Sequence, residues 1–343
     1  MSHHSNYSNS YRRAKVLVTG ADGFIGSHLV EALVAAGANV TALSLYTGSD
    51  THGWLDTLDD DVREAIKLVR GDVRDSAFTR RLVEGQEIVF HLAALIAIPY
   101  SYAAAQSYVD VNVTGTLNVL EGARAHGVRR IVHTSTSEVY GTAQFTPINE
   151  GHPVVAQSPY AASKAGADMM ATAYAKSFDS PIIILRPFNT YGPRQSERAV
   201  ISSTIRQALD PACTSIHLGD ISTKRDFTFV RDTARAFLAA GSVENLSYGE
   251  PYNCGTGRTV TISETVDAIR AAVGTNKPVV TEETRFRPGP SEVRLLEADA
   301  SRFQKATGWN SATALEDGIA ETVSWWRRRL QFGNVRPSGA YIA

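Results

Sequence analysis

The segment "AKVLVTGADGFIGSHL" (residues 14–29) decides the fold of this chain. It opens with a short apolar run that ends at Gly20, and a helical spacing of apolar residues begins near Phe24. An apolar strand, a glycine-rich turn and a helix, in that order, begin a βαβ unit. Gly20 can turn tightly, Gly23 lets a diphosphate approach the helix N-terminus, and Gly26 lets the helix pack closely on the sheet. The segment therefore predicts a dinucleotide-binding turn.

Strands and helices continue to alternate through the first half of the chain. Stretches with helical spacing separate the apolar runs "NVTALSL", "IKLVRGDV", "EIVFHLAAL", "RRIVHTS" and "PIIILRP". Such apolar strands are typical of a parallel sheet that helices cover on both faces. Because parallel crossovers are right-handed, the expected fold class is α/β: a Rossmann-type, doubly wound parallel sheet with a smaller C-terminal α/β substrate domain.

The domain boundaries follow from where this alternation weakens. We expect an NAD(P)-binding domain over residues 14–195, with returning segments near 226–256. Short strands separated by Gly, Pro and Asn follow, so residues 196–330 are expected to form an interleaved substrate domain. The polar stretch 1–13 has no apolar core, and we expect a disordered tail there rather than a signal peptide.

The composition excludes several classes of partner. The chain has 343 residues, 43% of them hydrophobic and 20% charged, with a net charge of −1, so no basic field favours nucleic acid. Cys213 and Cys254 are too few and too far apart for a metal site or a disulfide scaffold, which fits a cytoplasmic protein without a metal. No apolar run reaches the roughly 18 residues that a membrane span needs.

The choice of dinucleotide depends on the end of the second strand. NAD enzymes usually have an acidic residue there, which binds the ribose 2′-hydroxyl. This chain has Ser44 instead, and no neighbouring arginine that would receive a 2′-phosphate. We expect NAD, with NADP as the alternative. Asp72 ends the third strand, where it would either bind the adenine or cap the next helix.

The segment "SPYAASK" places Tyr160 and Lys164 four residues apart, on one face of a helix. A phenol is a weak base at neutral pH because its ordinary pKa is about 10. A nearby ammonium group favours the phenolate and lowers that value. Such a pair alone is common on helix surfaces, but downstream of a dinucleotide turn it indicates a phenol that takes a proton from a substrate hydroxyl.

A second strand end, "HTSTSEVYG", carries four hydroxyl residues and then the carboxylate of Glu138. A carboxylate at the end of a buried strand must be hydrogen-bonded, paired or reactive. Doubly wound sheets bind their ligands at this edge, so Glu138 is a candidate general base.

The motifs "TGADGFIGSH", "STSEVYG", "SPYAASKAGAD" and "RPFNTYGPR" together resemble the extended short-chain dehydrogenase/reductase family, and within it the nucleotide-sugar 4,6-dehydratases. The segments "FHLAALIAIPYSY" and "RPGPSEVRLL" resemble the legionaminic-acid pathway subgroup. The resemblance implies that Thr136 binds the substrate 4-oxygen beside Tyr160 and that Glu138 removes the C5 proton. It also implies further cofactor contacts from Phe24, Ile25, Val73, Leu92, Ala93, Ala94 and Pro187, with Lys164 on the ribose.

One position departs from the family pattern. Many 4,6-dehydratases have "TDE" where this chain has Thr136-Ser137-Glu138, and the missing aspartate protonates the departing 6-hydroxyl. Ser137 is a weak acid and a poor replacement. We therefore hypothesise that Glu138, once protonated, delivers its proton to O6 itself.

The resemblance also assigns the nucleotide end of the substrate. It implies that Asn189 contacts the diphosphate, and that Arg194 and Val200 belong to the substrate site. Arg225 and Arg287 offer planar guanidinium groups, which bind diphosphate oxygens bidentately. The subgroup implies an N-acetylated hexose, and UDP-GlcNAc is the expected substrate, although no residue type distinguishes UDP from GDP.

Three alternatives remain open: a nucleotide-sugar 4-epimerase, which needs no C5 base, a UDP-glucuronate decarboxylase, whose relatives also show "SEVYG", and a dinucleotide sensor without catalysis. The helices near 114–126 and 160–178 carry Ala, Met and Leu on more than one face. Relatives pair through these helices, so a homodimer is expected.

Overall fold

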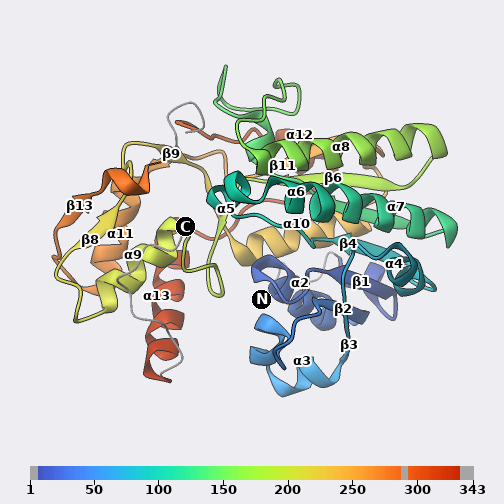
Figure 1. The fold of residues 1–343 in the computed structure, drawn as a ribbon, viewed down its shortest axis with the longest axis horizontal. Coiled ribbons are helices and arrows are strands. Elements are labelled where there is room, and N and C mark those ends of the chain that lie inside the picture. The colour runs from blue at the N-terminus through green and yellow to red at the C-terminus, as the bar shows by residue number, and fades with distance from the viewer. Residues whose placement is uncertain (1–6, 287–292, 333–343) are drawn as a thin grey trace.

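The structure, a computed structural model, describes residues 7–286 and 293–332. Its centre is a seven-stranded parallel sheet in the order β11-β6-β5-β4-β1-β2-β3 (Figure 1). The strands are β1 (Lys15–Thr19), β2 (Asn39–Leu45), β3 (Ile66–Gly71), β4 (Ile88–His91), β5 (Arg130–Thr134), β6 (Ile182–Pro187) and β11 (Pro251–Cys254). The order runs outward from β1 in both directions, so the predicted doubly wound sheet is confirmed. Ligands bind such sheets where the direction changes, here at the carboxyl ends of β1 and β4.

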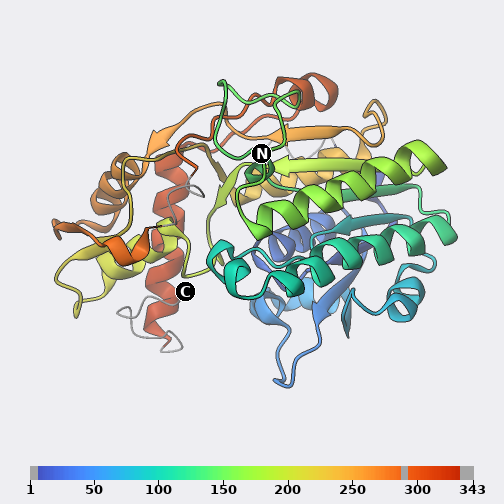
Figure 2. The same ribbon diagram turned by 45° about the horizontal axis from the view of Figure 1, so that its top comes forward.

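Helices cover both faces of this sheet. One face packs against α2 (Phe24–Ala35) and α10 (Val230–Ser242), around buried side chains such as Leu29 and Phe237. The other face packs against α4 (Ser76–Val83), α7 (Gly115–Ala125) and α8 (Pro159–Phe178). Figures 1 and 2 both show α7 and α8 side by side across the larger body. Two apolar layers explain why the strands have so few polar positions.

A smaller α/β unit follows, built from three two-stranded pairings. Strand β7 (Asn189–Tyr191) pairs with β10 (Phe227–Phe229), β9 (Lys224–Arg225) with β12 (Val260–Thr261), and β8 (Ile216–Leu218) with β13 (Val279–Thr281). Its helices are α9 (Val200–Leu209), α11 (Ile262–Val273) and α13 (Leu315–Gln331), which enclose a separate core. The chain passes back to the large sheet through α10 and β11 before it ends here.

Short elements complete the chain. They are α1 (Ser8–Tyr11), α3 (Asp60–Glu64), α5 (Ile98–Ala103), α6 (Ala105–Tyr108), α12 (Ser301–Thr307), the 3₁₀ turns η1 (Gly53–Thr57), η3 (Ser137–Tyr140) and η4 (Glu283–Arg285), and the π-helical segment η2 (Val109–Thr114). In the described residues, no helix is both long and apolar enough to cross a membrane.

The prediction of a disordered tail over residues 1–13 is wrong for its second half. The Tyr11 side chain is fully buried, packs against Phe90, and donates a hydrogen bond from its hydroxyl to the carbonyl oxygen of Leu238 at 2.6 Å. The hydroxyl of Tyr7 also donates a hydrogen bond, to the carbonyl oxygen of Thr307 at 3.1 Å. Two aromatic side chains thus anchor a stretch that is otherwise polar, and composition alone does not reveal such anchors.

Candidate active site

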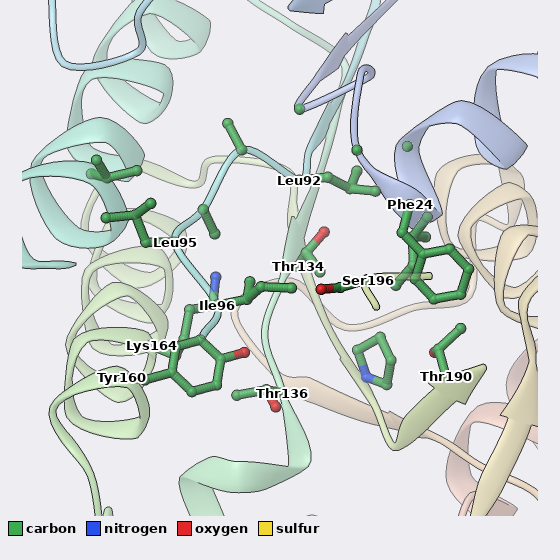
Figure 3. Close-up of a pocket in the computed structure, with 18 of the residues that line it drawn as sticks. Phe24, Leu92, Leu95, Ile96, Thr134, Thr136, Tyr160, Lys164, Thr190 and Ser196 are labelled. Carbon is green, nitrogen blue, oxygen red and sulfur yellow. The ribbon is translucent and has the colours of Figure 1, made fainter. Parts of the chain in front are cut away.

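A cavity of about 810 Å³ lies at the carboxyl edge of the sheet, where β1 and β4 end. Its walls come from the glycine turn, the ends of β2 to β6, helix α8 and the segment from Pro187 to Ala199. Figure 3 shows Tyr160, Lys164 and Thr136 gathered on one side and Phe24 on the other. We call the side with Tyr160 the reacting end, and the side formed by the glycine turn and the ends of β2 and β3 the dinucleotide end.

The glycine turn brings backbone close to this cavity. Gly20 has φ +65°, and a Cβ there would lie 2.7 Å from the amide nitrogen of Ala93. A Cβ at Gly26 would overlap the carbonyl oxygen of Gly20. The three glycines thus form a backbone cradle at the N-terminus of α2, where amide groups fit the diphosphate of a dinucleotide. Most predicted cofactor residues line the cavity: Gly20, Gly23, Phe24, Ile25, Gly26, Asp72, Val73, Leu92, Ala93, Ala94, Tyr160, Lys164 and Pro187.

Ser44 is the exception among the predicted cofactor residues. Leu43 and Leu45 line the cavity, whereas the Ser44 side chain is fully buried and its Oγ has no hydrogen-bond partner. Asp72 lines the cavity and accepts a hydrogen bond from Arg74 Nε at 2.9 Å. This contact with Arg74 is the main reason why the pKa of Asp72 is lowered. The cap of the next helix is Asp75 and not Asp72.

All five predicted catalytic residues line the reacting end: Thr136, Ser137, Glu138, Tyr160 and Lys164. Burial lowers the pKa of Lys164 to about 8. Burial raises the pKa of Tyr160, a hydrogen bond with Thr136 acts against this, and the Glu138 carboxylate adds to it. The pKa of Tyr160 is therefore raised and not lowered as expected, chiefly because the phenol is buried.

A buried ionic network that no sequence motif predicted supports the reacting end. Asp168 lies one helical turn after Lys164 and accepts hydrogen bonds from Ser135 at 2.7 Å and from Arg186 at 2.9 Å. His133 is hydrogen-bonded to the same carboxylate. Burial alone would raise the pKa of Asp168, but His133 and Arg186 outweigh it and lower that pKa. Asp168 thus ties α8 to the ends of β5 and β6, the elements that carry the reacting groups.

A second buried residue that supports the reacting end, Asn112, was not predicted from the sequence. Asn112 lies in the π-helical segment η2, fully buried, and donates hydrogen bonds to the carbonyl oxygen of Leu95 and to Ser163 Oγ, both at 2.9 Å. Its side-chain oxygen accepts from the Leu95 amide at 2.8 Å. The Asn112 side chain thus holds the loop after β4 against helix α8, which carries Tyr160. This loop lines the cavity. His91 has a structural role, because its ring lies between the hydroxyls of Thr19 and Thr116 and is hydrogen-bonded to both.

The predicted substrate residues divide into three groups. Asn189 and Arg194 line the cavity, although Arg194 is also paired with Glu31 at 2.8 Å. Val200 and Arg225 do not line it: Val200 begins α9, and buried Arg225 lies in β9. Arg287 lies outside the described residues.

Two polar atoms in the cavity wall have no partner in the protein. The Oγ1 of Thr134 and the Oδ1 of Asn189 are both buried without a hydrogen bond. Because such atoms cost free energy unless a ligand or water satisfies them, they mark where a polar ligand fits. Among the described residues, no group of three or more His, Cys, Asp or Glu side chains is arranged to hold a metal ion.

Comparison with known proteins places this geometry in a family. The chain is 36% identical to a UDP-glucose 4-epimerase from Mycolicibacterium smegmatis, over 92% of this chain and 100% of the relative. A dTDP-glucose 4,6-dehydratase double mutant from Streptomyces venezuelae, solved with NAD, is 30% identical with a TM-score of 0.82, covering 93% and 98% of the two chains. A UDP-N-acetylglucosamine 4-epimerase from Methanobrevibacter ruminantium, in complex with UDP-N-acetylmuramic acid, is 27% identical with a TM-score of 0.83, covering 93% and 99%.

A family model described as GDP-mannose 4,6 dehydratase matches residues 17–322, nearly the whole described chain. The match includes the glycine turn, the strand end with Glu138 and the helix of Tyr160. The chain therefore belongs to the nucleotide-sugar 4,6-dehydratase family of extended short-chain dehydrogenases/reductases.

Proposed function

We propose that this chain is a nucleotide-sugar 4,6-dehydratase, which uses NAD to convert UDP-GlcNAc into its 4-keto-6-deoxy product. The observation that carries the proposal is the carboxylate of Glu138 in the same cavity as Tyr160 and Thr136. The epimerase and dehydratase relatives both suit a Tyr–Lys pair, but only a dehydratase needs a base for C5. NAD fits the glycine cradle, as in the solved dehydratase relative.

The reacting residues divide the proton transfers between them. Tyr160 takes the proton of the sugar 4-hydroxyl while Thr136 orients that oxygen. The resulting 4-ketone acidifies the C5–H bond, and Glu138 removes that proton. NAD bound in the cavity would serve as hydride acceptor for C4 and later as hydride donor to C6. C5 regains a proton as Tyr160 gives up the one it took from the 4-hydroxyl, so that only water is lost overall. Lys164 lies at the same end, where it holds the ribose and adds positive charge near the phenol.

The departing 6-hydroxyl needs a proton, and Glu138 is the candidate donor. Ser137 takes the position of the usual acid, lines the cavity and is almost fully buried, but a hydroxyl is too weak an acid to protonate a leaving group. After Glu138 has accepted the C5 proton, it delivers that proton to O6. One carboxylate thus serves as base and then as acid, which is the single-carboxylate elimination expected from the sequence.

The assay that tests the proposal needs no added cofactor. The purified protein is incubated separately with UDP-GlcNAc, UDP-glucose, UDP-glucuronate and GDP-GlcNAc. The masses of the products are measured by mass spectrometry. A dehydratase product loses the mass of one water, a decarboxylase product loses carbon dioxide, and an epimerase product keeps its mass. With deuterium at C4, the label should appear in the product methyl group; a product without labelled methyl would contradict the proposal.

The role of Glu138 is tested separately with Glu138→Gln. The variant should lose water elimination by about a thousandfold, since a general base contributes on the order of 10²–10⁴ in rate. Exchange of the C5 proton with solvent should fall with it. Exchange at the wild-type rate would rule out Glu138 as the C5 base. A wild-type protein that neither removes water nor exchanges the C5 proton would instead favour the 4-epimerase, the second candidate, which the 36% identical relative supports.

The UDP and N-acetyl parts of the proposal rest on similarity. The solved epimerase relative is described with an N-acetylated UDP sugar, which shows that this fold has room for that group in a relative. We also propose a cytoplasmic homodimer that pairs through α7 and α8, because α8 exposes Met169 and Phe178. Light scattering would give the mass of the assembly in solution.

A further inference from the structure

One side chain in the cavity wall has no part in the proposed reaction. Trp54, in η1, lines the dinucleotide end of the cavity. Its backbone amide donates to the carbonyl oxygen of Asp22 at 3.0 Å, and the Asp22 carboxylate accepts from the amide of Leu45 at 3.1 Å. Asp22 belongs to the glycine turn. The turn, the end of β2 and Trp54 are therefore held together as one unit.

The other side of Trp54 meets the smaller domain. Its ring packs edge-on against Trp325 of α13, with centroids 5.6 Å apart. The Arg329 guanidinium lies over both rings, 4.7 Å from the Trp54 centroid and 5.5 Å from that of Trp325, and its Nε is buried without a hydrogen-bond partner. Arg329 is thus held by the two aromatic faces, as cation–π contacts require.

The contact continues into the core of the smaller domain. Trp325 packs against Trp326, with centroids 4.9 Å apart, and Trp326 is 1% exposed within that core. In Figure 1, α13 stands with β8, α9 and α11, apart from the blue elements that carry the glycine turn. A continuous set of packed rings therefore connects the dinucleotide end of the cavity to the other domain.

We propose that Trp54, Trp325 and Arg329 form an interdomain clasp that keeps the dinucleotide bound between turnovers. The inference rests on the proposed function, because it assumes that the glycine turn holds NAD. A 4,6-dehydratase returns its hydride to the product, so its dinucleotide has no need to leave. A clasp that slows release costs such an enzyme nothing, whereas it would limit an enzyme that exchanges its cofactor in each cycle. Trp325 and Arg329 are positioning residues, since neither lines the cavity.

The experiment measures release of NAD rather than turnover. Protein loaded with labelled NAD is diluted into excess unlabelled NAD, and the retained label is followed over time. Trp325→Ala should release NAD about tenfold faster, and Arg329→Ala about threefold faster, as expected for loss of an aromatic or cation–π contact. Turnover at saturating NAD should stay near the wild-type value.

Two further variants keep the test specific. Trp325→Phe retains an aromatic ring and should restore slow release, which a general loss of folding would not do. Arg328→Ala, an exposed neighbour on the same helix, is the matched control and should leave release unchanged. Wild-type release rates in Trp325→Ala and Arg329→Ala would overturn the clasp while leaving NAD binding intact. Failure of the wild-type protein to bind NAD would overturn the proposed function as well.

Discussion

The two ends of the cavity are held in different ways. At the reacting end, Asp168 and Arg186 form an ion pair whose side chains are only 2% and 5% exposed. At the dinucleotide end, Asp72 and Arg74 form an ion pair whose side chains are 26% and 50% exposed. Breaking a buried pair leaves an uncompensated charge, whereas an exposed pair is largely replaced by water. Charges removed from water thus fix the reacting groups, while backbone and packing shape the dinucleotide end.

The largest expected effect on the free energy of unfolding comes from removing the buried negative charge of Asp168. Asp168→Asn leaves Arg186 without a counterion, and the free energy of unfolding should fall by about 3–5 kcal/mol. The matched variant Asp72→Asn makes the same chemical change at the dinucleotide end and should cost less than about 1 kcal/mol. Urea denaturation at neutral pH measures both. Equal losses in the two variants would show that the two ends are not held differently.

The second effect concerns Lys164 at the reacting end, whose contribution to the free energy of unfolding should depend on pH. The folded pKa of Lys164 is about 8 and its ordinary value is 10.5, because burial disfavours the ammonium. The unfolded chain then binds more protons between these values, so this group destabilises the fold below pH 8 and ceases to do so as pH rises to 10.5. Lys164→Met should therefore be more stable than the wild type by up to about 3 kcal/mol near neutral pH.

The stability advantage of Lys164→Met should shrink steadily across that pH window. Thermal and urea unfolding at a series of pH values measure it. Lys176→Met provides the control, since Lys176 is exposed in the last turn of the same helix, and its difference from the wild type should stay constant. An advantage of Lys164→Met that does not change with pH would mean that the lysine is not desolvated in the folded protein.

The two ends also differ in how far the sequence predicts them. The glycine turn and the Tyr160–Lys164 pair both line the cavity, and each depends on a few consecutive residues in one strand or helix. Ser44 fails for a local reason: side chains alternate along a strand, so when Leu43 and Leu45 line the cavity, Ser44 faces away. The alternation of side chains along β2 therefore could have predicted that Ser44 points away from the cavity.

Other residues depend on packing between distant segments, which no local pattern encodes. Asp168 gains its role from strands β5 and β6, and Trp54 gains its role from a helix some 270 positions later in the chain. Arg225 was assigned by family pattern, but its strand pairs with β12 and the side chain is buried outside the cavity wall. The sequence therefore predicts which chemistry is present better than it predicts what holds that chemistry in place.

The third effect concerns Glu31, whose side chain is 32% exposed, more than that of Asp168 or of Asp72. Its carboxylate accepts two hydrogen bonds from Arg194, both at 2.8 Å, and joins α2 to the segment after β7. Burial would raise the pKa of Glu31, but the hydrogen bonds from His28 and Arg194 outweigh it and lower the pKa from 4.5 to about 2. A carboxyl with a depressed folded pKa stabilises the fold above its unfolded value, and this contribution is lost as pH falls from 4.5 towards 2.

Glu31→Gln removes this contribution. Because the carboxylate is 32% exposed, solvent screening reduces its value, and the variant should lose about 1 kcal/mol at neutral pH. The difference from the wild type should narrow when thermal unfolding is repeated near about pH 3.5, where the Glu31 carboxyl is already protonated in most of the unfolded chains but still ionised in the folded protein. A difference that grows on acidification would mean that Glu31 is stabilised in its neutral form, and the pairing with Arg194 would then not hold the two segments together by charge.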